Sequence, residues 1–231
     1  VIVPEGTYKI TDTIYVPQAI RLIGFGKTRP KFILADHAPG YNREYPGDKG
    51  NAKYMIWFTH KLPEPGEKEQ DFDANPGTFY SALSNIDIEI GRGNSNAIAL
   101  RTHYAQHSFI SHCFIDVGDA KAGIFDVGNV MEDVHIRGGQ YGIITTKCSP
   151  GWPFVMIDTS FKGQKKAAIK SREAGLTIIR TKVSDTPKFL TVDDDYWEKL
   201  YLEDSILENI SDAAIEISCE NNVFSQYNIR N

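Results

Sequence analysis

The sequence of 231 residues has little of several features that would define a function directly. It holds three cysteines, with no close cysteine pair and no cysteine–histidine set at metal-ligand spacing, so we expect neither a disulfide framework nor a metal site. No apolar run approaches the ~20 residues that cross a bilayer, so no membrane span is expected. P-loops, HExxH helices and GxSxG elbows are absent, and no cofactor is predicted.

Charge of one sign is not concentrated in this chain. With 25 Lys and Arg against 30 Asp and Glu, the formal net charge is −5. No basic block, and no basic strip interleaved with aromatic residues, occurs along the sequence. We therefore expect no nucleic-acid partner. The chain opens at Val1 with no signal-peptide pattern before its first apolar run.

What the sequence does have is a repeat. Short apolar blocks start at positions 83, 110, 131, 156, 178, 202 and 224, so that neighbouring starts are 27, 21, 25, 22, 24 and 22 residues apart. Such spacing marks a stacked array. The units are too short for a βαβ crossover and rich in Ile, Val, Thr and Phe, so each is interpreted as one coil of two or three short strands. The predicted fold is all-β, a single-stranded right-handed parallel β-helix.

Side chains alternate within the blocks. The fourth and sixth residues are mostly apolar or small, which predicts that they point inward. The third residues are polar and are expected to face solvent on one strand: Asn85, His112, Asp133, Asp158, Arg180, Asp204 and Gln226. A second strand is expected to begin at a small residue followed by an aliphatic one, as in Ala97-Ile98, Gly123-Ile124, Gly142-Ile143, Ala168-Ile169 and Ala214-Ile215.

The first third of the chain is organised differently. Residues 1–36 are predicted to form opening coils, because short β-rich runs alternate there with Pro and Gly. Residues 37–80 break the rhythm with five prolines, and we expect two long insertions flanking one strand at Tyr54–Phe58. Solenoids place such insertions on one face, often the binding face. The whole of 1–231 is predicted to be one β-helix domain.

Four segments resemble known proteins. The opening VPEGTYKITDTIYVPQAIRLIGFG is similar to the first coils of pectate-lyase-superfamily β-helices. The segments AIALRTHYAQHSFISHCFIDV (97–117), GIFDVGNVMEDVHIRGGQYGI (123–143) and SPGWPFVMIDTSFKGQKKAAI (149–169) resemble glycoside hydrolase family 55 and its bacterial relatives, most narrowly at Ala105-Gln106.

This resemblance implies a two-part enzyme. The chain would be the N-terminal half of a larger extracellular or periplasmic protein, with a second β-helix domain C-terminal to it. That domain would supply the catalytic acid, a Glu. The substrate would be a polysaccharide such as a β-glucan, hydrolysed with inversion. Such an arrangement leaves open whether this chain acts alone.

The candidate site lies in the turn 101–107, which offers two imidazoles, a carboxamide and a phenol within five residues. The resemblance implies that Gln106 positions the hydrolytic water. His103 stands where the family usually has Gln, and the two are the predicted catalytic pair. Tyr104 and His107 of the same turn are predicted to bind substrate, because sugars need planar hydrogen-bond groups beside aromatic faces. The alternative is a polar turn tied to neighbouring coils.

Three further residues are predicted to bind substrate. Asp126 and Asn129 end the matching strand one coil later, although both types also favour turns by bonding their own backbone. Trp152 is flanked by Pro and Gly and could be a sugar-stacking platform or pack over a coil corner. An acidic triplet at 193–195 could bind Ca²⁺, but a solvated turn is the favoured interpretation.

A carboxylate pair on adjacent coils is an alternative candidate for the catalytic centre. Asp133 and Asp158 are expected ~4.8 Å apart along the stack, close to the spacing of retaining glycosidases. The same column holds His112, Arg180 and Asp204, so a solvated ladder of alternating charge is favoured. Three functions remain open: a glycoside hydrolase, a non-catalytic glycan-binding or structural module, and a polysaccharide lyase.

Overall fold

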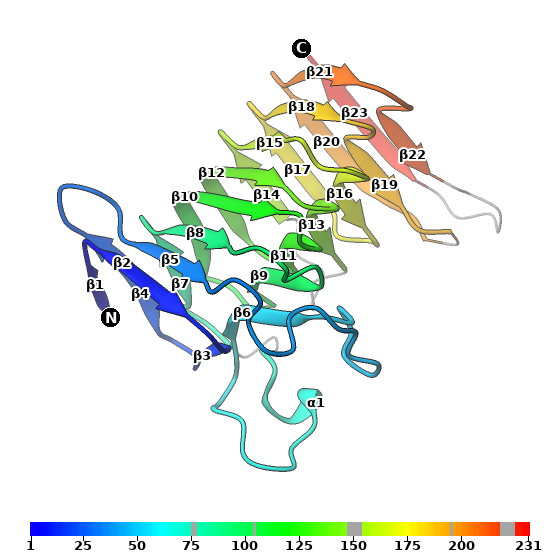
Figure 1. The fold of residues 1–231 in the computed structure, drawn as a ribbon. Coiled ribbons are helices and arrows are strands. Elements are labelled where there is room, and N and C mark those ends of the chain that lie inside the picture. The colour runs from blue at the N-terminus through cyan, green and yellow to red at the C-terminus, as the bar shows by residue number, and fades with distance from the viewer. Residues whose placement is uncertain (75–77, 104, 147–153, 195, 218–224) are drawn as a thin grey trace.

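The computed structural model describes residues 1–74, 78–103, 105–146, 154–194, 196–217 and 225–231. The chain winds into stacked coils that rise from the N-terminus to the C-terminus (Figure 1). All pairs of neighbouring strands are parallel, apart from one isolated antiparallel bridge between Thr59 and Asp73. The prediction of an all-β, right-handed parallel β-helix is confirmed.

Two sheets run the length of the stack. One path through the long, 15-stranded sheet is formed by β1 (Ile2–Pro4), β4 (Arg21–Phe25), β7 (Ala82–Ser84), β10 (Phe109–Gly118), β12 (Val130–Gly138), β14 (Phe154–Ile157), β17 (Leu176–Ile179), β20 (Lys199–Glu203) and β23 (Gln226–Arg230). The same sheet also contains β2 (Thr7–Ile10), β5 (Lys31–Leu34), β8 (Asp87–Ile90), β15 (Ser160–Lys162), β18 (Lys182–Thr186) and β21 (Ile206–Ile210). The eight-stranded sheet is formed by β3 (Ile14–Val16), β6 (Lys53–Phe58), β9 (Ala97–Arg101), β11 (Ala122–Phe125), β13 (Tyr141–Thr145), β16 (Ala167–Ser171), β19 (Leu190–Val192) and β22 (Ile215–Ile217).

Six of the seven blocks bend at their third residue. These residues adopt left-handed backbone conformations, with φ between +47° and +57° at Asn85, His112, Asp133, Asp158, Arg180 and Asp204. The expectation of one straight alternating strand was therefore wrong at this position, because a left-handed residue turns the chain by a corner. The fourth and sixth residues do point inward as predicted: Val134 and Ile136 are at most 1% exposed.

The core consists of columns of apolar side chains, one per coil. Ile110, Met131, Met156 and Ile178 form one such column and are fully buried. Cys113 is also fully buried in the core, as a small apolar residue, and burial raises the pKa of its thiol to about 12.

Small residues of the eight-stranded sheet face this core because larger side chains would collide. A Cβ at Gly142 would lie 2.5 Å from the Phe161 ring, and one at Gly123 would lie 2.9 Å from Ile136. The small–aliphatic pattern therefore marks this strand correctly. The first predicted pair, Ala97-Ile98, is two residues out of register with the other pairs. Ile124 pairs with Leu100, so the residue of β9 that corresponds to Gly123 is Ala99.

The register of the last block was also wrong. Ile229, rather than Phe224, stands in the column of Leu202, and Phe224 itself lies outside the described residues. The opening coils at 1–36 and the strand at Tyr54–Phe58, observed as β6, agree with the prediction. No helix among the described residues is both long and apolar enough to cross a membrane.

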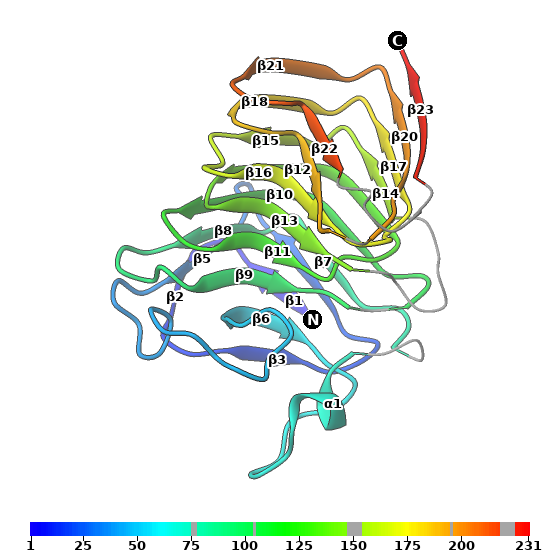
Figure 2. The ribbon, with the colours of Figure 1, turned by 90° about the vertical axis from the view of Figure 1, so that its right-hand side faces the viewer.

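The insertions around β6 pack on the outer face of the eight-stranded sheet. The second one contains a single helical turn that was not predicted, α1 (Glu69–Phe72), which lies beside β6 at the N-terminal end of the stack (Figure 2). Phe72 closes over the sheet, with its ring 5.0 Å from Trp57 and 6.0 Å from Tyr15. The insertions therefore wall one end of this face.

Candidate functional site

A buried arginine joins the insertions to the sheet. Arg101 ends β9 on the outer face and is fully buried. Its guanidinium donates to Asp48 at 2.7 Å, to Glu69 at 2.5 Å and to Asp73 at 2.7 Å. A buried charge is tolerated only when it is paired and hydrogen-bonded, and three carboxylates from two insertions meet that need.

Aromatic rings enclose the same guanidinium. It lies 4.4 Å from the ring centroid of Trp57, 4.9 Å from Tyr54 and 5.3 Å from Phe125. Arg101 also donates to the Tyr54 hydroxyl at 3.0 Å. Cation–π attraction is strongest in such a desolvated setting. We call Arg101, Asp48, Glu69, Asp73, Tyr54 and Trp57 the Arg101 cluster.

The carboxyl groups of the cluster differ in their affinity for protons. Burial raises the pKa of Glu69 to about 7, and a hydrogen bond with Asp48 adds to this, while Arg101 opposes it. Burial acts to raise the pKa of Asp73. The nearby His103, the charge of Arg101 and the hydrogen bonds from Trp57 and Arg101 outweigh it and leave that pKa below its usual value. Near pH 7 the carboxyl group of Glu69 is therefore protonated in about half of the molecules.

A cavity of about 480 Å³ opens onto this cluster. Its wall includes four aromatic side chains, those of Tyr15, Tyr45, Tyr54 and Trp57. Asp48, Glu69, Gln70, Lys53 and Lys68 supply polar groups. Apolar rings with a few convergent polar groups are the usual lining of a small-molecule site.

The predicted catalytic turn adjoins the Arg101 cluster. The ring of His103 approaches Asp73, with Nδ1 3.8 Å from Oδ2, an ion-pair distance rather than a hydrogen bond. Gln106 is partly buried, and its side-chain carbonyl oxygen is enclosed. His107 is exposed and stacks on Tyr80, with ring centroids 5.0 Å apart. Tyr104 lies outside the described residues.

Asp126 and Asn129 do lie beside this turn, as predicted. Asn129 donates to the Ala105 carbonyl at 2.5 Å, which fixes the turn to the next coil. Asp126 is 3% exposed and accepts a hydrogen bond from Thr146. Asn129 thus supports the turn, whereas Asp126 is too buried to bind a sugar directly. Trp152 lies outside the described residues.

Spare hydrogen-bonding capacity gathers at this place. Among the described residues, eight buried side-chain polar atoms lack a hydrogen-bond partner. Seven of these atoms lie at the ends of β6, β9 and β11 or in the segments that follow these three strands. They are His60 Nδ1, Ser81 Oγ, Arg101 Nε, Thr102 Oγ1, His103 Nδ1, Gln106 Oε1 and Asp126 Oδ2. Buried polar groups without partners are rare, and they call for water or a ligand's hydroxyl groups.

Further along the same face the character of the surface changes. A groove of about 520 Å³ is lined by Tyr141 and by five cationic side chains, those of Lys49, Lys121, Lys166, Lys170 and Arg172. No carboxylate is among its lining residues, although the chain carries a net charge of −5. Burial, together with the charges of Lys170 and Lys166, lowers the pKa of Lys121, against the opposing effect of Asp48 and Glu44.

The alternative carboxylate pair is part of the expected ladder. Asp133 accepts hydrogen bonds from His112 at 2.8 Å and His135 at 3.0 Å, and Asp158 accepts two from Arg180 at 2.6 and 2.7 Å. Asp193 pairs with Lys170 and Arg172, and no group of three metal-ligating side chains occurs among the described residues.

A family model described as "Rhamnogalacturonase A/epimerase, pectate lyase-like" matches residues 1–188. The chain belongs to this family. No curated protein matches it. Two solved structures that resemble it are catalytic domains of a GH87 α-1,3-glucanase, each an aspartate-to-alanine variant in complex with tetrasaccharides. Both are 9% identical, with TM-scores of 0.34 and 0.25 over 98% and 96% of this chain. The chain spans 63% and 64% of their length.

In this pectate-lyase-like domain, the turn 101–107 was predicted from the sequence, but the carboxylates of Asp48 and Glu69 beside it were not. Arg101 was included in the predicted turn, whereas Asp48 and Glu69 were not singled out. They lie 53 and 32 residues before Arg101, in insertions that carry no repeat. The only sequence feature that pointed to them was the pair of long insertions, because solenoids place such insertions on one face, often the binding face.

Proposed function

We propose that this pectate-lyase-like domain is the polysaccharide-binding part of a glycoside hydrolase, with the sugar chain held on the outer face of the eight-stranded sheet. The observation that carries the proposal is the cavity at the Arg101 cluster, whose wall combines four aromatic side chains with convergent polar groups. Sugars need both kinds of contact, hydroxyl partners and flat apolar faces.

In this proposal hydrolysis proceeds with inversion. Gln106 and His103 hold the attacking water, since each presents a buried side-chain polar atom without a hydrogen-bond partner among the described residues. In place of an acid from a second domain, Glu69 is the general acid, because its pKa of about 7 leaves it partly protonated near neutral pH. The water gives up a proton to the His103 imidazole as its oxygen bonds to the anomeric carbon, and the glycosidic oxygen leaves with the proton of Glu69. Inversion also requires a base ~6.5–9.5 Å from the acid.

A panel assay tests the proposal. The chain, and a longer protein that includes the sequence after Asn231, are incubated with a β-glucan, an α-glucan and a uronate-containing polymer, and new reducing ends are measured. We expect release by the longer protein and at least a hundredfold loss with Gln106→Ala. Asp158→Asn, on the distant ladder, should leave turnover unchanged. If neither protein cleaves any polymer, the hydrolase proposal fails.

One observation favours a second function, a non-catalytic glycan-binding module. Asp48 and Glu69 share a hydrogen bond and the same guanidinium, so they are too close for either glycosidase geometry. In that case the polymer binds without turnover, and His103→Ala or Gln106→Ala weakens binding. Affinity electrophoresis in gels that contain each polymer separates this outcome from hydrolysis.

A further inference from the structure

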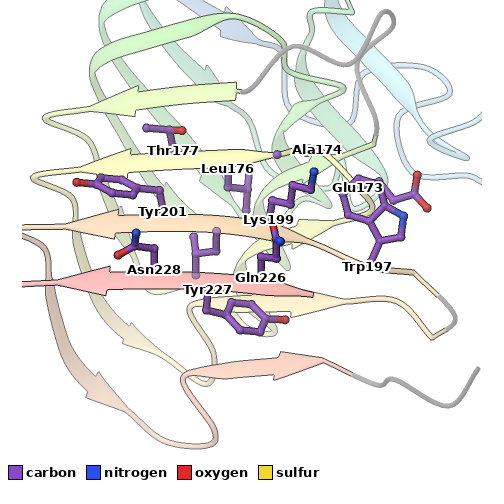
Figure 3. A pocket seen from close by; sticks show the side chains of 12 residues that line it. Glu173, Ala174, Leu176, Thr177, Trp197, Lys199, Tyr201, Gln226, Tyr227 and Asn228 are labelled. Carbon is purple, nitrogen blue, oxygen red and sulfur yellow. The ribbon is translucent and has the colours of Figure 1, made fainter. Parts of the chain in front are cut away.

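A second groove lies on the long sheet, away from the face described above (Figure 3). It has a volume of about 670 Å³ and spans the three strands β17, β20 and β23 near the C-terminal end of the stack. Nothing in the proposed hydrolytic site involves these residues. The groove therefore needs an explanation of its own.

Alternate residues of one strand form its floor. Trp197, Lys199 and Tyr201 are separated by two positions each, while Leu200 and Leu202 between and after them are buried. Because strand side chains alternate between faces, Lys199 and Tyr201 point to the same side. Figure 3 shows Trp197 at one end of the groove and Tyr201 at the other, with Lys199 between them. Four residues of strand separate the two rings, roughly 13 Å.

Neighbouring strands place polar groups beside these rings. Tyr201 pairs in register with Thr177 on one side and Asn228 on the other, and Lys199 pairs with Gln226. Among the described residues, the side-chain amide of Gln226 and the Thr177 hydroxyl have no hydrogen-bond partner. The groove thus offers hydroxyl and amide groups between two aromatic faces.

The end of the groove at Trp197 is held rigidly by a buried acid. Glu198 is fully buried and accepts hydrogen bonds from the backbone amides of Ala174 at 3.1 Å, Gly175 at 2.8 Å and Lys199 at 2.8 Å, and one from the Ser171 hydroxyl. The carbonyl of Trp197 accepts from the Glu173 amide at 3.1 Å. The backbone that carries the indole is therefore fixed before any ligand arrives, which reduces the entropy lost on binding.

We propose that this groove is an accessory binding site for a neutral oligosaccharide. Aromatic faces at both ends can stack on sugar rings, while the amides of Gln226 and Asn228 bond hydroxyl groups. Its lining contains one cation, Lys199, and one carboxylate, Glu173, in contrast to the five cations of the groove on the other sheet. This balance favours an uncharged ligand. The site does not depend on hydrolysis at the first one.

Calorimetric titration with neutral hexasaccharides tests the proposal, using β-1,3-, β-1,4- and α-1,3-linked glucose hexamers as probes. We expect saturable binding of at least one probe and about tenfold weaker binding with Trp197→Ala or Tyr201→Ala. Tyr196→Ala is the matched control, because Tyr196 is an exposed neighbouring aromatic residue outside the groove. Circular dichroism confirms that each variant is folded.

Two results would overturn the proposal. One is binding by the folded Trp197→Ala and Tyr201→Ala variants that is as tight as that of the unaltered chain. The other is the absence of binding by all three probes. The test of this groove is independent of the test of the hydrolytic site, because Gln106→Ala should leave calorimetric binding at Trp197 intact. Conversely, Trp197→Ala should leave any cleavage of soluble oligosaccharides unchanged.

Discussion

Arg101 and Trp57 share one carboxylate. The indole Nε1–H of Trp57 donates to Asp73 Oδ1 at 2.8 Å, and the Arg101 guanidinium donates to Oδ2 of the same group at 2.7 Å. The guanidinium also lies 4.4 Å from the Trp57 ring centroid. Two neighbouring strands, β6 and β9, thereby hold the end of an insertion between them. Trp57 also lines the cavity on the outer face of the sheet.

Replacing this arginine should destabilise the domain strongly. Arg101→Met leaves three poorly solvated carboxylates without their cation, and we expect a loss of about 3 to 5 kcal/mol in the free energy of unfolding. Urea denaturation followed by circular dichroism measures it. Arg180→Met, which removes an exposed arginine paired with Asp158, should barely move the midpoint. Equal effects of the two substitutions would show that the Arg101 cluster does not anchor the insertions.

The proton on Glu69 predicts a pH dependence of stability. Because the pKa of this carboxyl is raised to about 7 in the fold, the stability that its protonated form contributes is present at acid pH. It is lost as pH rises through about 7. The thermal midpoint of the unaltered chain should therefore fall relative to that of Glu69→Gln between pH 5 and pH 8. A difference that stays constant over this range would mean that Glu69 is ionised throughout.

The left-handed corners predict which substitutions the ladder accepts. Asp133 has a φ of +51°, a conformation that Asn adopts readily and a β-branched residue does not. Asp133→Asn and Asp133→Val both remove the charge that pairs with His112. Only the valine adds backbone strain, so it should be about 1 to 2 kcal/mol less stable than the asparagine variant. Chemical denaturation of the two proteins compares them, and equal stabilities would argue against the corner.

Glu198 is expected to be intolerant of an amide. The buried carboxylate of Glu198 accepts hydrogen bonds from three backbone N–H groups. In Glu198→Gln, the side-chain NH₂ group would face N–H groups in place of an accepting oxygen. We expect a loss of about 1 to 3 kcal/mol from the free energy of unfolding, measured by denaturation. Glu208→Gln, at an exposed pair with Lys182, is the matched control. A loss no greater than that of the control would contradict the role given to Glu198.

The coils could be predicted from sequence because every coil must present apolar side chains to the same core columns. That requirement repeats at Ile110, Met131 and Met156, and it is visible as spacing. The corners were not predicted, although Asn, Asp and His are enriched at positive φ and occupy five of the six corners. Only Arg180 is a residue type without that signal. Such a corner resembles strand alternation when only polarity is read.

The candidate site was predictable only in part, for a related reason. Gln106 and His103 follow a repeated strand, so their position could be anticipated from the coil before and after. Glu69 and Asp48 lie in insertions without a repeat, and only the folded chain brings them to Arg101. Nor could the groove at Trp197 be found, because it needs the register of β20 against β17 and β23.

The indole signal of Trp57 gives the most direct test of where polysaccharide binds. In a ¹⁵N–¹H spectrum, assigned with a Trp57→Phe variant, this signal is followed while β-glucan and uronate hexamers are added. A sugar on the outer face of the eight-stranded sheet should shift it saturably, with weaker affinity in His103→Ala. Cleavage that leaves the Trp57 signal unmoved, or saturable binding by the Trp197→Ala variant that leaves it unmoved, would contradict this placement of the site.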